Sequence, residues 1–358
     1  MKKNARKSVI FYLLILPFLT SCIYDIVDDP FNIEEAISSY DLRVVISSEK
    51  HLAFPDLIYH DKTWYVTYRE SDLHVLGTYS KIIVLKSVDF KNWTFCNSYE
   101  NPLYDLRDPK FSFNEVTNEL YLHFHGASNL SQTSRYSLTR ENFYVSYNKQ
   151  IGKFNDEEKV KKLKLPTTNS YSWLWRPIWH DGNLYAAGYL SGLKFHKYTN
   201  IDTVPYTIFN SSIGGETTLR FYKNRLYALS RYGDGAMFGE STLSNDSLLK
   251  LDKSIDNLMQ WTILNFNGQL GGPNMLIKDS VVYIGGRIKQ REVPRTAIYK
   301  YSLKDKSLNL MEELVSYGDN SYPGLYIKND SLYGVYYTQS NNYNMYEILS
   351  FVLNLRKY

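Results

Sequence analysis

A short pattern recurs six times along this chain: two apolar-rich runs are separated by a polar turn, and the second run opens with an apolar residue followed by a tyrosine. The six tyrosines are Tyr65, Tyr121, Tyr185, Tyr227, Tyr283 and Tyr333. The turns are rich in Gly, Asn and Asp, and the runs in aromatic and β-branched residues, which is the composition of β-hairpins. The intervals between the tyrosines, 42 to 64 residues, match propeller blades better than shorter solenoid repeats. The pattern therefore predicts an all-β fold, a six-bladed β-propeller.

The repeat also predicts the place of a functional site. Four residues after each tyrosine comes a large polar or aromatic residue: Arg69, His125, Tyr189, Arg231, Arg287 and Tyr337. Eleven residues before the tyrosines of the fourth and sixth repeats come Glu216 and Tyr322. Equivalent repeat positions lie at equal heights around a propeller axis, so we expect these side chains at one end of the central channel. Any one of them could simply end an exposed strand, but their combination favours a site.

The first residues have the pattern of a bacterial lipoprotein signal peptide. A basic start is followed by an apolar run from Val9 to Leu19 and then by Leu19-Thr-Ser-Cys22. The apolar run is too short to span a membrane. We therefore expect cleavage before Cys22 and lipid attachment on Cys22. This predicts a membrane-anchored lipoprotein of the bacterial outer membrane, on its periplasmic or cell-surface side.

Three segments follow from these patterns. Residues 1–21 are predicted to be the signal peptide, 22–44 a polar tether, and 45–358 a single propeller domain. The excess of basic over acidic residues comes from the signal peptide, so the mature charge gives no reason to expect a nucleic-acid partner. With Cys22 acylated, Cys96 has no partner for a disulfide. No Cys/His spacing typical of a metal site is present, and we expect no cofactor.

Two turns carry a Ser-x-Asp followed by a tryptophan, in the stretches 87–93 and 254–261. An aspartate there can accept hydrogen bonds from its own turn while the tryptophan packs beneath it. Together with the six repeats, these turns resemble the Asp boxes, S-x-D-x-G-x-x-W, of the sialidase (neuraminidase) superfamily, whose catalytic domain is a six-bladed propeller. The first copy is one residue short, and the second has Leu258 in place of the glycine. The resemblance extends over most of residues 45–350 and is closest to the bacterial exo-sialidase type.

The order of polar residues extends this resemblance. Family members have a Glu at the start of blade four, an Arg soon after it, a second Arg in blade five and a Tyr at the start of blade six. Glu216, Arg231, Arg287 and Tyr322 follow that order here. The resemblance implies that Tyr322 is a nucleophile activated by Glu216, which acts as its base. It also implies that the two arginines bind the carboxylate of an acidic sugar, for which guanidinium groups are well suited.

The sequence departs from the family pattern in two places. The family's first Arg lies in an Arg-Ile-Pro tract, but this chain has Ala53-Phe54-Pro55, so we expect Arg69 or Arg107 to replace it. The general acid is normally an Asp in the loop before the first Asp box, where this chain has both Asp72 and His74. A histidine with an ordinary pKa could also donate the proton. The sequence leaves both choices open.

Three functions fit these observations. The first is an exo-acting glycoside hydrolase of sialidase type that cleaves acidic glycans containing sialic or uronic acid. The second is a propeller polysaccharide lyase, in which a Tyr or His removes the proton alpha to a neutralised carboxylate. The third is a non-catalytic glycan-binding surface lipoprotein. A lyase product absorbs ultraviolet light through its new double bond, and a binding protein shows no turnover, so product analysis separates the three.

Overall fold

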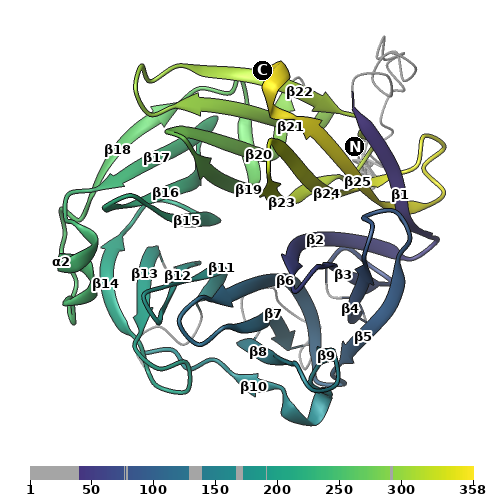
Figure 1. Ribbon diagram of the computed structural model, residues 1–358, viewed down its shortest axis with the longest axis horizontal. Helices are drawn as coiled ribbons and strands as arrows, with labels where there is room; N and C mark the ends of the chain where they lie inside the picture. Colours follow the sequence, from purple (N-terminus) through teal and green to yellow (C-terminus); the bar gives the residue numbers. More distant parts are fainter. Residues whose placement is uncertain are drawn as a thin grey trace, which may run out of the picture.

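The protein is described by a computed structural model that covers residues 40–75, 77, 80–128, 139–166, 172–190, 192–290 and 293–358. The predicted signal peptide, Cys22 and most of the predicted tether lie outside the described residues. Six antiparallel sheets surround a common axis (Figure 1), and each contributes one strand to the centre of the ring. The prediction of an all-β, six-bladed propeller is confirmed.

Blades one to three are formed by consecutive strands. Blade one consists of β2 (His51–His60), β3 (Thr63–Ser71), β4 (Ser80–Ser87) and β5 (Thr94–Glu100). Blade two consists of β6 (Tyr104–Asn114), β7 (Glu119–Ser128), β8 (Arg140–Asn148) and the short β9 (Lys153–Phe154) and β10 (Lys161–Lys162), with η1 (Glu157–Lys159) between the last two. Blade three consists of β11 (Trp173–His180), β12 (Asn183–Tyr189), β13 (Leu193–Tyr198) and β14 (Tyr206–Ser211).

Blades four to six complete the ring. Blade four consists of β15 (Thr217–Tyr222), β16 (Arg225–Tyr232), β17 (Gly235–Ser241) and β18 (Met259–Leu264), with α2 (Asn245–Leu249) before its last strand. Blade five consists of β19 (Gln269–Lys278), β20 (Val281–Gln290), β21 (Val293–Ser302) and β22 (Leu308–Leu314). Blade six consists of β23 (Ser321–Lys328), β24 (Ser331–Gln339), β25 (Tyr346–Asn354) and β1 (Asp41–Ser48), and η3 (Leu355–Lys357) follows β25.

Blade six is closed by the first strand of the chain. β1 pairs antiparallel with β25, with Asp41 opposite Val352, so the two ends of the propeller share one sheet (Figure 1). This corrects the predicted tether boundary, because residues 41–44 belong to β1. The strand lies at the outer edge of the blade, and several of its side chains are exposed. It therefore lacks the alternation of apolar and polar residues that marks a half-buried strand in a sequence.

The repeated tyrosines all lie in the second strand of their blades, β3, β7, β12, β16, β20 and β24. Their side chains help to fill the apolar layers between neighbouring blades; the ring of Tyr185, for example, packs edge-on against Phe221 of blade four at 4.8 Å. The first Asp-box turn also has its expected form, since Asp89 accepts hydrogen bonds from the backbone N–H groups of Lys91 and Asn92 at 2.9 and 2.8 Å. Within the described residues, no helix is long and apolar enough to cross a membrane.

The innermost strands of five blades share a β-bulge immediately before or at a proline. The dipeptides are Phe54-Pro55, Asp108-Pro109, Arg176-Pro177, Gly272-Pro273 and Tyr322-Pro323. In each, the residue before the proline has a positive φ, between 40° and 57°. Only glycine adopts this conformation freely, so the other four positions hold strained backbone of the kind that collects at functional sites. Blade four differs: β15 pairs with β16 without interruption from Thr217 onward.

Candidate functional site

The site lies at the mouth of the channel where the six inner strands begin. In the second strands, the residues four positions after the repeated tyrosines lie opposite residues that flank the bulges of the inner strands. Arg69 lies opposite Ala53, Arg287 opposite Gly271 and Tyr337 opposite Ser321. In blade four, the backbone N–H of Arg231 donates to the carbonyl of Glu216 at 3.0 Å. The predicted convergence of these repeat positions at one mouth is therefore confirmed.

A buried tyrosine–glutamate pair occupies this mouth. The hydroxyl of Tyr322 donates a hydrogen bond of 2.8 Å to Glu216 Oε1, across 106 residues of sequence. Glu216 Oε2 accepts a 2.8 Å hydrogen bond from the backbone N–H of Gly272 and lies 3.5 Å from Arg231 Nη1. Both oxygens of the carboxylate are thus held, and one of them is aimed at the phenol. The predicted contact between Glu216 and Tyr322 is confirmed.

Aromatic rings enclose Tyr322. The rings of Phe54 and Trp175 pack edge-on against it at 5.0 and 5.7 Å, and the guanidinium of Arg287 lies over it, 5.4 Å from its centre. Burial raises the pKa of Tyr322 well above its usual value, and the negative charge of Glu216 raises it further, although Arg287 opposes them. The phenol is consequently neutral at physiological pH. For it to react as an oxyanion, its proton must pass to Glu216 during the reaction.

Gly272 lets the tyrosine ring occupy this position. It lies at the bulge of blade five with φ near 57°, and a Cβ built on it would approach the Tyr322 ring to 2.6 Å. Such contacts are far inside van der Waals distance, so any side chain here would displace the ring. The glycine is therefore required both by its backbone conformation and by the close approach of Tyr322.

Arg231 and Arg287 border the pair from two blades. Arg231 Nη2 donates to Gln269 Oε1 at 2.6 Å, and about a third of its side chain, 34%, is exposed. Arg287 Nη1 donates to Asp319 Oδ1 at 3.2 Å, and 22% of its side chain is exposed. Each arginine thus uses part of its fork within the protein and presents another part to the mouth. Their predicted position beside Glu216 and Tyr322 is confirmed.

The two candidates for the missing first arginine behave differently. Arg69 is fully buried, and its guanidinium donates to Asp105 at 2.7 Å and to the carbonyls of Leu106 and Leu73. Because these donors are committed inside the protein, the contacts favour Arg107 over Arg69. The guanidinium of Arg107 is also largely buried; it lies 3.7 Å from Asp105 Oδ2 and over the ring of Phe54 at 5.1 Å. A substrate contact of either arginine stays a prediction.

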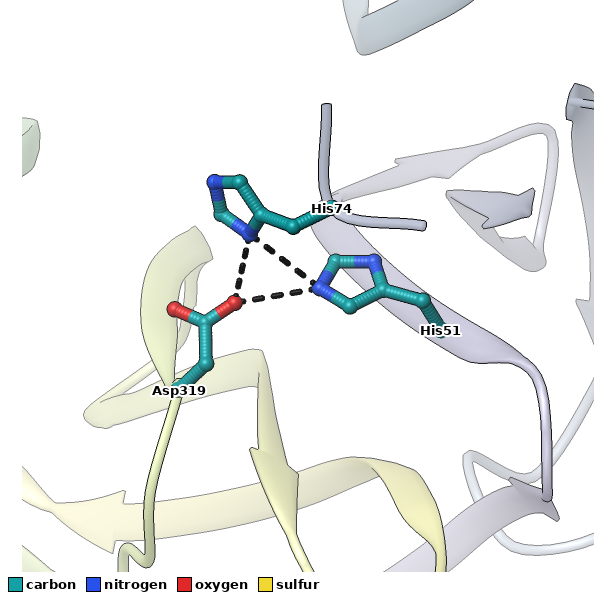
Figure 2. A group of neighbouring side chains, drawn as sticks. All are labelled: His51, His74 and Asp319. Carbon is teal, nitrogen blue, oxygen red and sulfur yellow. Dashed lines mark hydrogen bonds and ion pairs between the residues drawn. The ribbon is translucent and has the colours of Figure 1, made fainter. Parts of the chain in front are cut away.

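Of the two candidate acids, His74 joins the site. Figure 2 shows the imidazoles of His51 and His74 converging on the carboxylate of Asp319. His74 Nδ1 lies 2.6 Å and His51 Nε2 3.0 Å from Asp319 Oδ2. Asp72 is exposed on the same loop and accepts a hydrogen bond from Ser71 Oγ at 3.1 Å. The contacts therefore favour His74 over Asp72.

Asp319 links these histidines to the rest of the site. Its Oδ1 accepts a hydrogen bond of 2.9 Å from the Tyr337 hydroxyl as well as that from Arg287. Burial by itself would raise the pKa of Asp319, but the hydrogen bonds from His51 and His74 outweigh it and hold the pKa below its usual range. Asp319 is therefore a carboxylate at any physiological pH.

Sequence reasoning missed Asp319, His51 and Asp108. His51 and Asp319 are 268 residues apart, and no local pattern connects them. Asp108 is a buried carboxyl at the bulge of blade two; burial raises its pKa, Glu216 raises it further, and Arg107 and Lys110 lower it. Here a signal existed, because Asp108, like Tyr322, directly precedes a proline in the first strand of its blade.

Comparisons with known proteins agree with this architecture. No protein-family model matches the sequence, and no curated protein matches it. Among solved structures, the NanB sialidase of Streptococcus pneumoniae aligns with a TM-score of 0.63 at 8% identity, over 88% of this chain and 71% of that chain. The chain has the propeller fold of the sialidases. The intramolecular trans-sialidase of Ruminococcus gnavus aligns with a TM-score of 0.60 at 10% identity, over 86% of this chain and 95% of that one.

A third structure is the sialidase of Trypanosoma rangeli in complex with sialic acid. It aligns with a TM-score of 0.58 at 14% identity, over 85% of this chain. The alignment spans only 54% of the Trypanosoma chain, so this protein corresponds to about half of it. At such low identities the likeness establishes the fold, and the activity must be argued from the site itself.

Proposed function

We propose that this protein is an exo-acting glycoside hydrolase of sialidase type that cleaves acidic sugars, sialic or uronic, from glycans. The observation that carries the proposal is the buried hydrogen bond from Tyr322 to Glu216, with the guanidinium of Arg287 over the phenol ring. A phenol aimed at a carboxylate inside a cationic mouth is suited to covalent attack on an anomeric carbon. The fold shared with sialidases supports the same reaction class.

In the proposed reaction, Tyr322 Oη forms a bond to the anomeric carbon while Glu216 accepts the phenolic proton. The bond from that carbon to the leaving oxygen breaks, and the leaving oxygen takes a proton from His74. Water then attacks the glycosyl–tyrosine intermediate, and the two proton transfers reverse. His74 suits the acid role because 43% of its side chain is exposed at the mouth while Asp319 orients its ring. Over both steps one water molecule is consumed, and the free acidic sugar and the protonated leaving group are the products.

The charges around the pair favour an acidic substrate. Arg231 and Arg287 each present part of a guanidinium to the mouth, and Arg107 lies behind Phe54. A guanidinium carries five N–H donors, so the bond from Arg287 to Asp319 leaves capacity for a substrate carboxylate. The Trypanosoma rangeli sialidase, whose fold is similar, was solved with sialic acid. These features support a glycan partner with a carboxylate.

A screen of purified protein against sialosides and uronic-acid oligosaccharides tests the proposal. Release of a free acidic sugar that disappears in the Tyr322→Phe variant is the expected result. A product that absorbs ultraviolet light would instead indicate a lyase. Glycan binding without any product would favour a binding protein and overturn the hydrolase.

We further propose that Cys22 carries a lipid that anchors the propeller to the bacterial outer membrane, on its periplasmic or surface side. The support is the sequence of the first 22 residues, with its basic start, apolar run and Leu19-Thr-Ser-Cys22. Cys22→Ala should move the protein from the membrane fraction to the soluble fraction of a bacterial host. Persistence of that variant in the membrane fraction would contradict the proposal.

A further inference from the structure

Three potential metal ligands from distant parts of the chain meet beside the site. His51 begins β2, His74 lies in the loop after β3, and Asp319 lies in the loop before β23 (Figure 2). Besides their distances to Asp319 Oδ2 of 3.0 and 2.6 Å, the two imidazole nitrogens lie 3.2 Å from each other. Each side chain therefore offers one lone-pair atom to a single shared point.

The spacing of these atoms is close to that of one face of a metal coordination sphere. Imidazole nitrogens and carboxylate oxygens bind zinc tetrahedrally at about 2.0–2.2 Å, which places neighbouring ligand atoms about 3.3–3.6 Å apart. The three observed separations, 3.0, 3.2 and 2.6 Å, are shorter, so a small outward shift of the side chains is enough to admit the cation. We propose that His51 Nε2, His74 Nδ1 and Asp319 Oδ2 form a binding site for a divalent first-row transition metal, with Zn²⁺ as the preferred ion.

The surrounding groups orient the three ligands. Asp319 Oδ1 is held by the Tyr337 hydroxyl and by Arg287, which leaves Oδ2 directed at the histidines. Phe54 packs against both imidazoles, with ring centres 6.4 and 5.5 Å apart. Such outer contacts are what fix ligand orientation in metal sites.

If a metal binds His51 at Nε2, the ring proton must lie on Nδ1, and the surroundings of Nδ1 allow this. Arg69 Nη1 lies 3.5 Å from His51 Nδ1 but donates its shorter hydrogen bond, 2.8 Å, to the carbonyl of Leu73. The long contact with Arg69 therefore does not commit the His51 ring to one tautomer. In the metal-bound state the Nε2 lone pair faces the cation, and the ring proton that Nε2 shares with Asp319 in the free protein moves to Nδ1.

The charges beside the triad select among cations. Arg69 places positive charge beside His51, and Arg287 places it beside the single carboxylate, Asp319. Mg²⁺ and Ca²⁺ depend on several oxygen ligands, whereas imidazoles suit Zn²⁺ and its neighbours. We therefore expect Zn²⁺ to bind with moderate affinity and Mg²⁺ and Ca²⁺ not to compete. The exposure of His74 leaves the fourth side of the cation open to water or to a substrate oxygen.

The metal site stands without the proposed hydrolase, but one consequence rests on it. If His74 donates the proton to the leaving group, a cation bound to its ring competes with that role. Zn²⁺ should then inhibit turnover with the same midpoint as its binding curve. Binding is measured independently of turnover, so failure of the site and failure of the hydrolase give different results.

The test uses the tag-free chain, stripped with a chelator and then titrated with ZnCl₂ by calorimetry. We expect one Zn²⁺ per protein, a rise in melting temperature on saturation, and no heat with MgCl₂ or CaCl₂. His74→Ala should weaken binding at least 10-fold and abolish the thermal shift; because His74 is partly exposed, this variant should still fold. The matched control is His180→Ala, which removes a histidine that lies 3.5 Å from Asp181 but belongs to the other end of the channel.

Two results would overturn the proposal. One is the absence of stoichiometric Zn²⁺ binding to the unmodified chain. The other is binding of unchanged affinity in both His74→Ala and Asp319→Asn. Stoichiometric binding that leaves turnover unaffected would support the metal site and remove His74 from the proposed acid role.

Discussion

The two mouths of the channel are built from the same six inner strands but differ in how their polar groups are paired. The mouth at the strand beginnings holds the Tyr322–Glu216 pair and the Asp319 cluster. The other mouth, formed by residues further along the same strands, encloses a cavity of about 420 Å³. It also has aromatic rings and arginines, but Arg176 binds Asp56 at 2.6 Å and Arg220 binds Asn274 at 3.1 Å.

The comparison shows that the cavity lies at the opposite mouth from the tyrosine–glutamate pair. In the cavity, these two arginines have acceptors that the protein itself supplies. At the opposite mouth, a phenol is paired with the carboxylate that can take its proton, and arginines remain partly exposed. The bulges contribute to this difference, because they carry Tyr322, Phe54 and Gly272 into mutual contact at one end. The proposed chemistry depends on this pairing and on the strained backbone at the bulges, and it makes no use of the cavity.

The largest expected effect comes from the nucleophile. Tyr322→Phe should lower turnover at least ~10³-fold while the ring still packs, because only the attacking oxygen is lost. Tyr326→Phe is the matched control: it lies on the same strand, β23, and faces the cavity at the other mouth. Rates on a released-sugar assay distinguish them. Equal activity of the two variants would contradict the proposal that only the mouth with Tyr322 is reactive.

The base should matter somewhat less. Glu216→Gln keeps an acceptor for the Gly272 N–H but cannot take the phenolic proton, so turnover should fall about 10²-fold or more. Glu115→Gln, which alters a carboxylate of the opposite cavity, should leave turnover within about twofold. Steady-state rates measured on both variants check this. A fully active Glu216→Gln enzyme would move the base elsewhere.

Arg287 should affect binding more than chemistry. Arg287→Ala should weaken affinity for an acidic sugar by about 2 kcal/mol, which is roughly 30-fold, because a charged hydrogen bond to the carboxylate is lost. Arg220→Ala, at the other mouth, should leave that affinity unchanged. Calorimetric titration with an acidic sugar, in the Tyr322→Phe background, measures both. Equal losses in the two variants would mean that the acidic sugar binds elsewhere.

Gly272 should affect the stability of the fold. Gly272→Ala must adopt a positive φ and also push the Tyr322 ring away, whereas Gly233→Ala has the same backbone problem with open space around it. We expect about 1–2 kcal/mol of lost unfolding free energy for Gly233→Ala and a clearly larger loss for Gly272→Ala. Chemical denaturation measures the difference. Identical losses of unfolding free energy would show that the contact with the Tyr322 ring does not destabilise the Gly272→Ala variant.

Much of the fold could be predicted from the sequence because its signals are local. Hairpin turns and the tyrosine of each second strand repeat at blade intervals, and symmetry then placed Glu216 and Tyr322 at one mouth. The first half of the outer strand β1 was assigned to the tether because its side chains are exposed or only half-buried and carry no alternation.

The rest of the site depends on contacts that only the closed ring creates. His74 and Asp319 meet across 245 residues, and neither position has a partner at a recognisable spacing. The buried carboxylate of Asp105 beside Arg69 could not be inferred either, so that arginine was expected to contact a substrate. Asp108 was within reach of prediction, because the recurrence of a residue before proline in five blades marks the bulge positions.

The closure of blade six has a consequence for the order of events during synthesis. β1 is synthesised near the start of the chain, but its partner β25 ends at Asn354. β1 can therefore pair in its sheet only after β25 has been synthesised. Tyr322 lies on β23 of that same blade, and it meets Glu216 only when the blade docks beside blade five. Closing such long-range contacts is slow compared with forming local hairpins. A chain that stops before blade six therefore lacks the assembled tyrosine–glutamate pair, and the proposed site is complete only once the ring of blades has closed.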